Sequence, residues 1–185
     1  MCVVTDAVVI LDRSVLMRMR DLYYPARRGA STVARHISSQ TSHRLRGVIG
    51  FAETASDIEL DELDEAGSDL GTNLMAAVAL GQERLDHGGG RLIAFSHFEP
   101  TACTLTGGVF FSYPPNAETI DMTVKQIFAA RDDDITIDAF CLDVAPNDVT
   151  RGVLSAMVDT GGRVVEVGPD DCDAAIQNYL EQEWS

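Results

Sequence analysis

The sequence predicts an α/β fold with a doubly wound, mostly parallel central sheet and helices on both faces. Short, continuous apolar runs recur along the chain, and segments of helical composition lie between them. Such runs are typical of strands buried on both faces of a parallel sheet. Repeated alternation of strand and helix implies right-handed crossovers. The 185 residues, 45% of them hydrophobic, are enough to build one core. We therefore expect a single domain, residues 1–185.

The elements follow in chain order. Residues 7–11 form an apolar run bounded by Asp6 and Asp12, which predicts the first strand. Pro25 suits the first turn of a helix reaching about Ser39, because its missing N–H would be unpaired there anyway. Residues 52–69 predict an edge strand followed by an acidic loop, and 98–115 an irregular region. The remaining predicted strands are 48–52, 92–95, 135–142 and 164–167, and the remaining helices are 73–85, 116–130, 148–158 and 170–183.

Charge excludes some classes of partner. The 14 Lys and Arg residues against 29 Asp and Glu residues give a net charge of −15. Such an acidic surface repels phosphate backbones and anionic lipids, so we expect binding neither to nucleic acid nor to membrane. The first 47 residues run against this trend, with eight arginines and three acids. Arg18, Arg20, Arg27 and Arg28 either form a basic patch for an acidic partner or pair with the protein's own acids.

The sequence also indicates a compartment. The four cysteines show no C-x-x-C pair, so neither a disulfide scaffold nor a zinc site is indicated. The first 12 residues lack the pattern of a secretory signal, and no apolar run approaches the length of a bilayer span. We expect a cytoplasmic protein with reduced thiols.

Three polar clusters mark the expected functional edge of the sheet. In an open α/β sheet, ligands bind just past the carboxyl ends of the strands. Asp12-Arg13-Ser14 follows the first predicted strand, and Ser96-His97 follows the strand at 92–95. Gly71-Thr72-Asn73 opens a predicted helix, where side-chain oxygens and backbone N–H groups point outward. We expect these three segments to meet.

The clusters resemble the metal-ion-dependent adhesion site of the von Willebrand factor A (vWA) domain. That family has Asp-x-Ser-x-Ser, a Thr in Gly-Thr-Asn/Ser and an Asp in Thr-Asp-Gly-Glu-Pro; this chain has DRSVL at 12–16, GTN at 71–73 and SHFEPTA at 96–102. Further segments, such as MRMRDLYYPARR at 17–28 and FFSYPPNAETI at 110–120, are similar to a bacterial branch associated with AAA+ ATPases of the MoxR and magnesium-chelatase kind. The resemblance implies a Rossmann-like vWA fold.

The resemblance also implies a degenerate metal site. Asp12, Ser14 and Thr72 match metal-ligand positions, whereas Leu16 stands where the family has its second serine and His97 where it has an aspartate. Mg²⁺ prefers about six oxygen ligands, and imidazole shifts the preference toward Zn²⁺, Ni²⁺ or Cu²⁺. We expect that no cofactor is required, with Mg²⁺ or another divalent cation at Asp12, Ser14, Thr72 and His97 as the alternative. In the metal-free hypothesis, a protonated His97 replaces the ion beside Asp12.

The leading functional prediction is a non-enzymatic module for protein–protein interaction. The resemblance implies a MoxR-type AAA+ ATPase as the class of partner. One alternative is a metal-dependent adhesion module, and another is a hydrolase or phosphatase using Asp12, Ser14 and His97, which lacks the Gly-x-Ser-x-Gly turn of many serine hydrolases. The sequence leaves the oligomeric state open. The predicted partner-binding residues are Arg13, Leu16, Phe98, Glu99, Phe111 and Tyr113.

Overall fold

The core of the protein is a six-stranded sheet, in which only the β2–β3 pair is antiparallel. The computed structural model describes residues 4–59, 69–142 and 146–184, so most of the predicted acidic loop lies outside the described residues, as does Cys2. The predicted fold class, including the edge strand, is confirmed. The strand order is β3 (Ala55–Asp57), β2 (His43–Phe51), β1 (Thr5–Asp12), β4 (Gly90–Ser96), β7 (Ile135–Cys141) and β8 (Val164–Glu166).

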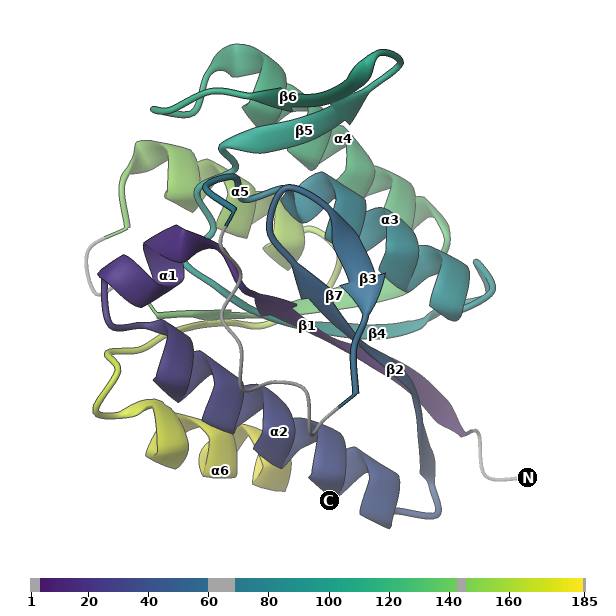
Figure 1. The fold of residues 1–185 in the computed structure, drawn as a ribbon. Helices are drawn as coiled ribbons and strands as arrows, with labels where there is room; N and C mark the ends of the chain where they lie inside the picture. The colour runs from purple at the N-terminus through teal and green to yellow at the C-terminus, as the bar shows by residue number, and fades with distance from the viewer. Residues whose placement is uncertain (1–3, 60–68, 143–145, 185) are drawn as a thin grey trace.

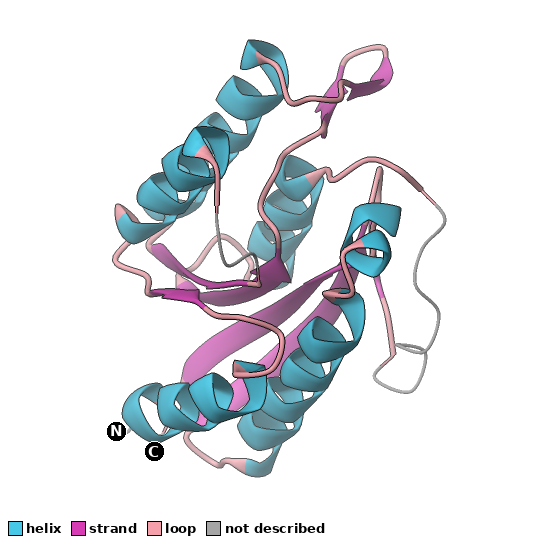
Figure 2. Ribbon diagram, turned by 90° about the vertical axis from the view of Figure 1, so that its left-hand side faces the viewer, coloured by secondary structure: helices cyan, strands magenta, loops and turns pink. Residues whose placement is uncertain are grey.

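Helices cover both faces of this sheet (Figures 1 and 2). Along β1, Val9 and Leu11 point into the core on the side of α2 and α6, while Val8 and Ile10 point into the core on the side of α3 and α5. The strand is therefore buried on both faces, as its unbroken apolar sequence predicts. Among the described residues, no helix has the length and apolar character needed to cross a membrane. The helices are α1 (Val15–Met19), α2 (Tyr23–Ser39), α3 (Leu74–Arg84), α4 (Ala117–Asp132), α5 (Asp148–Val158) and α6 (Cys172–Glu183).

Three elements, a short helix and the two strands of a hairpin, were not predicted from the sequence. The five-residue helix α1 begins directly after Ser14 and is too short to show a helical period. In the region predicted to be irregular, β5 (Ala102–Leu105) and β6 (Gly108–Phe111) form an antiparallel hairpin. Its two-residue turn, Thr106-Gly107, is followed by Gly108 with φ of 125°, a conformation that favours glycine.

A buried polar network anchors the last helix to the sheet. The Tyr179 hydroxyl donates a hydrogen bond to Oδ2 of Asp138 over 2.6 Å, and the Arg91 guanidinium lies 3.3 Å from the same oxygen. Burial raises the pKa of both Asp138 and Tyr179. Glu183, at the end of α6, accepts hydrogen bonds from Arg91 and Arg163, each at 2.8 Å. The network therefore ties α6 to β4 and β7.

We predict that Glu183→Gln destabilises the protein by about 1 kcal/mol at neutral pH. The neighbouring guanidinium of Arg91 is the main cause that holds the pKa of Glu183 below its ordinary value of 4.5. Because the pKa is lower in the folded than in the unfolded chain, the ionised carboxylate stabilises the fold above the unfolded value and loses this effect as the pH falls through the folded value. Urea unfolding should therefore show the difference at neutral pH and a smaller one below pH 4.5.

Glu181→Gln is the matched control, because Glu181 is exposed on the same helix and makes no ion pair with the described residues. It should leave the free energy of unfolding nearly unchanged. An equal effect of both substitutions, or a Glu183→Gln effect independent of pH, would contradict the anchoring role.

Candidate functional site

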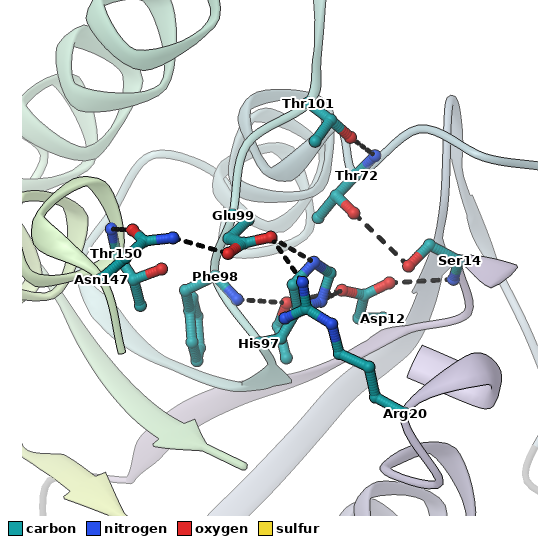
Figure 3. Close-up of polar contacts among 11 residues, drawn as sticks. Asp12, Ser14, Arg20, Thr72, His97, Phe98, Glu99, Thr101, Asn147 and Thr150 are labelled. Carbon is teal, nitrogen blue, oxygen red and sulfur yellow. Dashed lines mark hydrogen bonds and ion pairs between the residues drawn. The ribbon is translucent and has the colours of Figure 1, made fainter. Parts of the chain in front are cut away.

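The polar segments predicted to meet do lie together at the carboxyl ends of the strands. β1 and β4 are adjacent and parallel, so the residues that follow them emerge at the same edge of the sheet. The loop before α3 joins them there, because the Asn73 N–H donates to the Ala52 carbonyl at the end of β2. Figure 3 shows Asp12, Ser14, Thr72 and His97 grouped at this edge.

The carboxylate of Asp12 is the centre of the cluster and is fully buried. Its Oδ1 accepts a hydrogen bond from the backbone N–H of Ser14 at 2.9 Å, and its Oδ2 accepts one from the Ser96 hydroxyl at 2.6 Å. The Ser96 oxygen in turn accepts a hydrogen bond from the Phe98 N–H at 3.0 Å. The donors that satisfy Asp12 therefore come from both its own loop and the loop after β4.

His97 lies between two carboxylates and is also fully buried (Figure 3). Its Nδ1 is 3.1 Å from Oδ2 of Asp12, and its Nε2 is 4.0 Å from Oε2 of Glu99. Among the described residues, neither ring nitrogen has a partner in good hydrogen-bond geometry. The imidazole thus lies beside Asp12, as expected from its position in the motif, where the family has an aspartate. It makes no hydrogen bond to Ser14. Of the three residues of the hypothetical hydrolytic triad, His97 and Asp12 are therefore in contact, while the Ser14 hydroxyl bonds to Thr72 instead.

Thr72 connects this cluster to the hairpin. Its hydroxyl donates a long hydrogen bond of 3.4 Å to the Ser14 hydroxyl, while its N–H donates to Oγ1 of Thr101 at 2.9 Å. Asn73 caps α3 by accepting a hydrogen bond from the Ala76 N–H at 3.1 Å. Thr101 was not predicted from the sequence, because it contacts the site only through the backbone of Thr72.

These donors do not fit a Mg²⁺ site. Mg²⁺ demands near-octahedral oxygen coordination. Among the described residues, Asp12 is the carboxylate that lies with the two hydroxyls, and both of its oxygens already accept hydrogen bonds. Leu16 offers no oxygen, and the imidazole of His97 takes the place of a second carboxylate. Within the part of the chain that the structure describes, no group of three His, Cys, Asp or Glu side chains is arranged to hold a metal ion.

Glu99 joins three loops around the cluster (Figure 3). Arg20, which follows α1, donates to its Oε2 at 3.0 Å, and the Asn147 side chain donates to its Oε1 at 2.6 Å. Asn147 also caps α5 by accepting a hydrogen bond from the Thr150 N–H at 2.9 Å. The sequence analysis missed Asn147, although an asparagine just before a helix is a recognisable N-cap signal.

The structure divides the predicted partner-binding residues into two groups. Phe111 and Tyr113 are exposed, at 43% and 59%, and Arg13 and Leu16 are partly buried. Phe98 and Glu99 were expected on the surface, but Phe98 is fully buried and Glu99 is 7% exposed. The backbone of Phe98 has φ of 58°, and its ring packs in the core with residues of α3 and α5. Neither side chain is available for direct contact, which corrects the expectation.

The arginines after α1 and in α2 show internal pairing. Arg20 pairs with Glu99, and Arg28 lies 3.5 Å from Asp173 on α6. The sequence left open whether these arginines form a basic patch or pair with the protein's own acids. The structure shows pairing for Arg20 and Arg28.

Comparison with known proteins identifies relatives by sequence and by fold. A family model described as "Rv0959-like protein, vWA domain" matches residues 6–180. No curated protein matches the sequence. Among solved structures, the fold is similar to the open conformation of the pilus adhesin SpaC from Lactobacillus rhamnosus GG (12% identity, TM-score 0.68), human COPII-coat protein Sec24c (13%, 0.65) and proximal thread matrix protein 1 from the mussel byssus (11%, 0.61).

These structural matches cover 96%, 95% and 96% of the present chain, but only 30%, 31% and 47% of the other chains. The present chain therefore spans less than half the length of each. At such low identity, the likeness concerns the fold alone.

We predict that Ser96→Ala costs about 2–3 kcal/mol of stability, because it leaves one oxygen of a buried carboxylate and one buried N–H without a partner. Ser14→Ala is the matched control. Among the described residues, its hydroxyl makes only the long contact with Thr72, so we expect a loss of no more than about 1 kcal/mol. Chemical denaturation of the two variants measures both values. The reverse order would show that Ser14 rather than Ser96 holds the cluster together.

Proposed function

This chain belongs to the vWA family, in the group of Rv0959-like proteins, and on that premise we propose that it is a non-enzymatic module that binds a protein partner without a metal ion. The binding surface in this proposal is formed by the loops at the carboxyl ends of the strands. The observation that carries it is the buried cluster of Asp12, Ser96 and His97, in which protein groups satisfy the carboxylate that would otherwise hold a cation.

The cluster gives the surface a fixed shape. The three loops are joined by buried hydrogen bonds from Ser96 to Asp12 and from Thr72 to Thr101 and Ser14, and a partly buried bond from Asn147 to Glu99 adds the loop before α5. Buried hydrogen bonds of this kind hold the segments that they join in one arrangement. Phe111, Tyr113 and the partly exposed Arg13 lie on the chain segments that extend from these loops. A rigid scaffold that presents exposed side chains on loops is well suited to binding another protein.

The proposed absence of catalysis follows from the same geometry. Ser14 is not hydrogen-bonded to the His97 imidazole, and no other base among the described residues bonds to its hydroxyl. Burial raises the pKa of the Cys103 thiol and raises that of Cys172 to about 11, which disfavours the reactive thiolate. Buried thiols also suit a reducing compartment, and we propose the cytoplasm.

For the partner, we propose a MoxR-type AAA+ ATPase, the class implied by the resemblance to the bacterial branch of the family. The proposal predicts that the purified chain binds the MoxR-type ATPase of its own organism in a direct assay such as biolayer interferometry. Tyr113→Ala should weaken binding about tenfold, since an exposed aromatic side chain at an interface often carries more than 1 kcal/mol.

Val158→Ala is the control, because Val158 is 51% exposed at the end of α5. Helix α5 begins at the carboxyl edge of the sheet and runs away from it. The control should bind as the wild type does. Absence of binding in every nucleotide state of the ATPase would reject this partner, and equal binding by the Tyr113→Ala variant would reject this surface.

The metal-free proposal predicts that EDTA leaves the melting temperature unchanged and that millimolar Mg²⁺ or Mn²⁺ does not raise it. A ligand that binds only the folded state stabilises it by an amount that rises with the ratio of ligand concentration to Kd, so a thermal shift reports metal binding directly. The comparison variant is Leu16→Ser/His97→Asp, which restores the hydroxyl and the carboxylate of the family motif and should gain a response to Mg²⁺. A saturable stabilisation of the wild type by either cation would refute the proposal.

A further inference from the structure

The β5–β6 hairpin differs in composition from the rest of this acidic chain. None of residues 100–117 is charged, although the chain has 14 basic and 29 acidic residues. Strand β6 reads Gly-Val-Phe-Phe, with Val109 42% and Phe111 43% exposed, and Tyr113 follows at 59%. Both views show the hairpin projecting at the end of the molecule far from α2 and α6 (Figures 1 and 2). The exposed apolar side chains therefore lie on a part of the molecule that another protein molecule can approach.

The hydrogen-bond pattern shows which backbone groups of β6 point outward. The Ser112 N–H donates to the Thr101 carbonyl at 2.8 Å, and the register pairs Cys103 with Phe110 and Thr104 with Val109. Bonded and non-bonded pairs alternate along an antiparallel ladder. Phe110 and Ser112 are thus in the bonded set, and the N–H and C=O groups of Val109 and Phe111 point away from β5.

The two edges of the hairpin are not equivalent. On the β5 side, the Ala102 N–H donates to the Thr72 carbonyl at 3.3 Å, and Oγ1 of Thr104 accepts from the Asn73 side chain at 3.0 Å. On the β6 side, none of the described residues forms a hydrogen bond with the N–H of Val109 or Phe111. Natural edge strands are commonly protected by lysine, proline, a bulge or a covering segment, and Gly108–Phe111 contains neither lysine nor proline.

We propose that β6 pairs with β6 of a second copy of this chain, in an antiparallel arrangement with its two-fold axis at Phe110. Val109 then lies opposite Phe111 of the second copy, and the outward groups of each pair form two hydrogen bonds, four in total. Phe110 lies opposite its own counterpart. Cross-strand pairs of an aromatic with a β-branched or another aromatic residue stabilise a sheet. The two hairpins become one four-stranded sheet of order β5-β6-β6-β5.

The uncharged hairpin is where a second copy can approach. Two copies that each carry a net charge of −15 repel one another, and this repulsion is weakest where residues 100–117 of both copies, none of them charged, face each other. The register is also self-complementary, which a two-fold interface requires. Because the shared edge is short, the dimer is weak, and salt strengthens it by screening the repulsion between the two bodies.

Sedimentation velocity of the purified chain, from micromolar to millimolar concentration and at low and high salt, tests the pairing. The expected result is a mass that rises with concentration from 20.0 kDa toward twice that value, and rises further with salt. Val109→Pro removes one outward N–H without touching the bonds to β5, and Val109→Lys places a charge on the edge. Each should weaken self-association about tenfold or more.

Thr106→Lys is the matched control, since Thr106 is exposed in the turn of the same hairpin. It should dimerise as the wild type does, and thermal melting of each variant checks that the fold is retained. A wild type that stays at 20.0 kDa up to millimolar concentration overturns the proposal, as does equal dimerisation by a folded Val109→Pro or Val109→Lys variant. In either case, the edge would be left for a strand of another protein.

Discussion

The loops at the carboxyl edge of the sheet depend on one buried group, the carboxylate of Asp12. It lies at the end of β1, inside the sheet between β2 and β4, where water does not reach it. An ionised carboxylate in such a place is stable only with close donors or an opposite charge. The Ser14 N–H and the Ser96 hydroxyl supply the donors. This requirement fixes the loops after β1 and β4 relative to one another.

The groups that surround the buried Asp12 carboxylate come from the chain itself. Where the family motif has an aspartate and a second serine, His97 and Leu16 remove one carboxylate and one hydroxyl that a cation would need. The imidazole lies between Asp12 and Glu99, and Glu99 is held in turn by Arg20. The same three loops that a metal would organise are thus linked by protein contacts. In the metal-free function proposed above, this surface would not depend on the supply of cations, whereas a metal-dependent adhesion site does.

The fold could be predicted from the sequence because the parallel strands are buried on both faces and therefore consist of unbroken apolar runs. Asp12, Thr72 and His97 were also expected to lie together, since adjacent parallel strands end at one edge. The hairpin was not predicted, because its strands are too short to show an alternation of apolar and polar residues and their pairing is set by the Thr106-Gly107 turn. Phe98 was expected on the surface, because nothing in the sequence marks the positive φ that turns this ring into the core. Local backbone geometry of this kind is decided by tertiary packing.

The hairpin and the polar cluster are parts of one framework. Thr72 donates its N–H to the Thr101 side chain and accepts at its carbonyl from Ala102, so the loop beside Ser14 also carries the first strand of the hairpin. A Cβ on Gly71 would lie 2.6 Å from Cγ of Glu53 and 3.0 Å from Cβ of Ala102, so any larger residue would force these neighbours to shift. Any contact that orders β6 therefore acts on a segment bonded to Thr72. The uncharged hairpin and the buried carboxylate are consequently linked twice, through the loop before α3 and through the segment that joins Ser96 to β5.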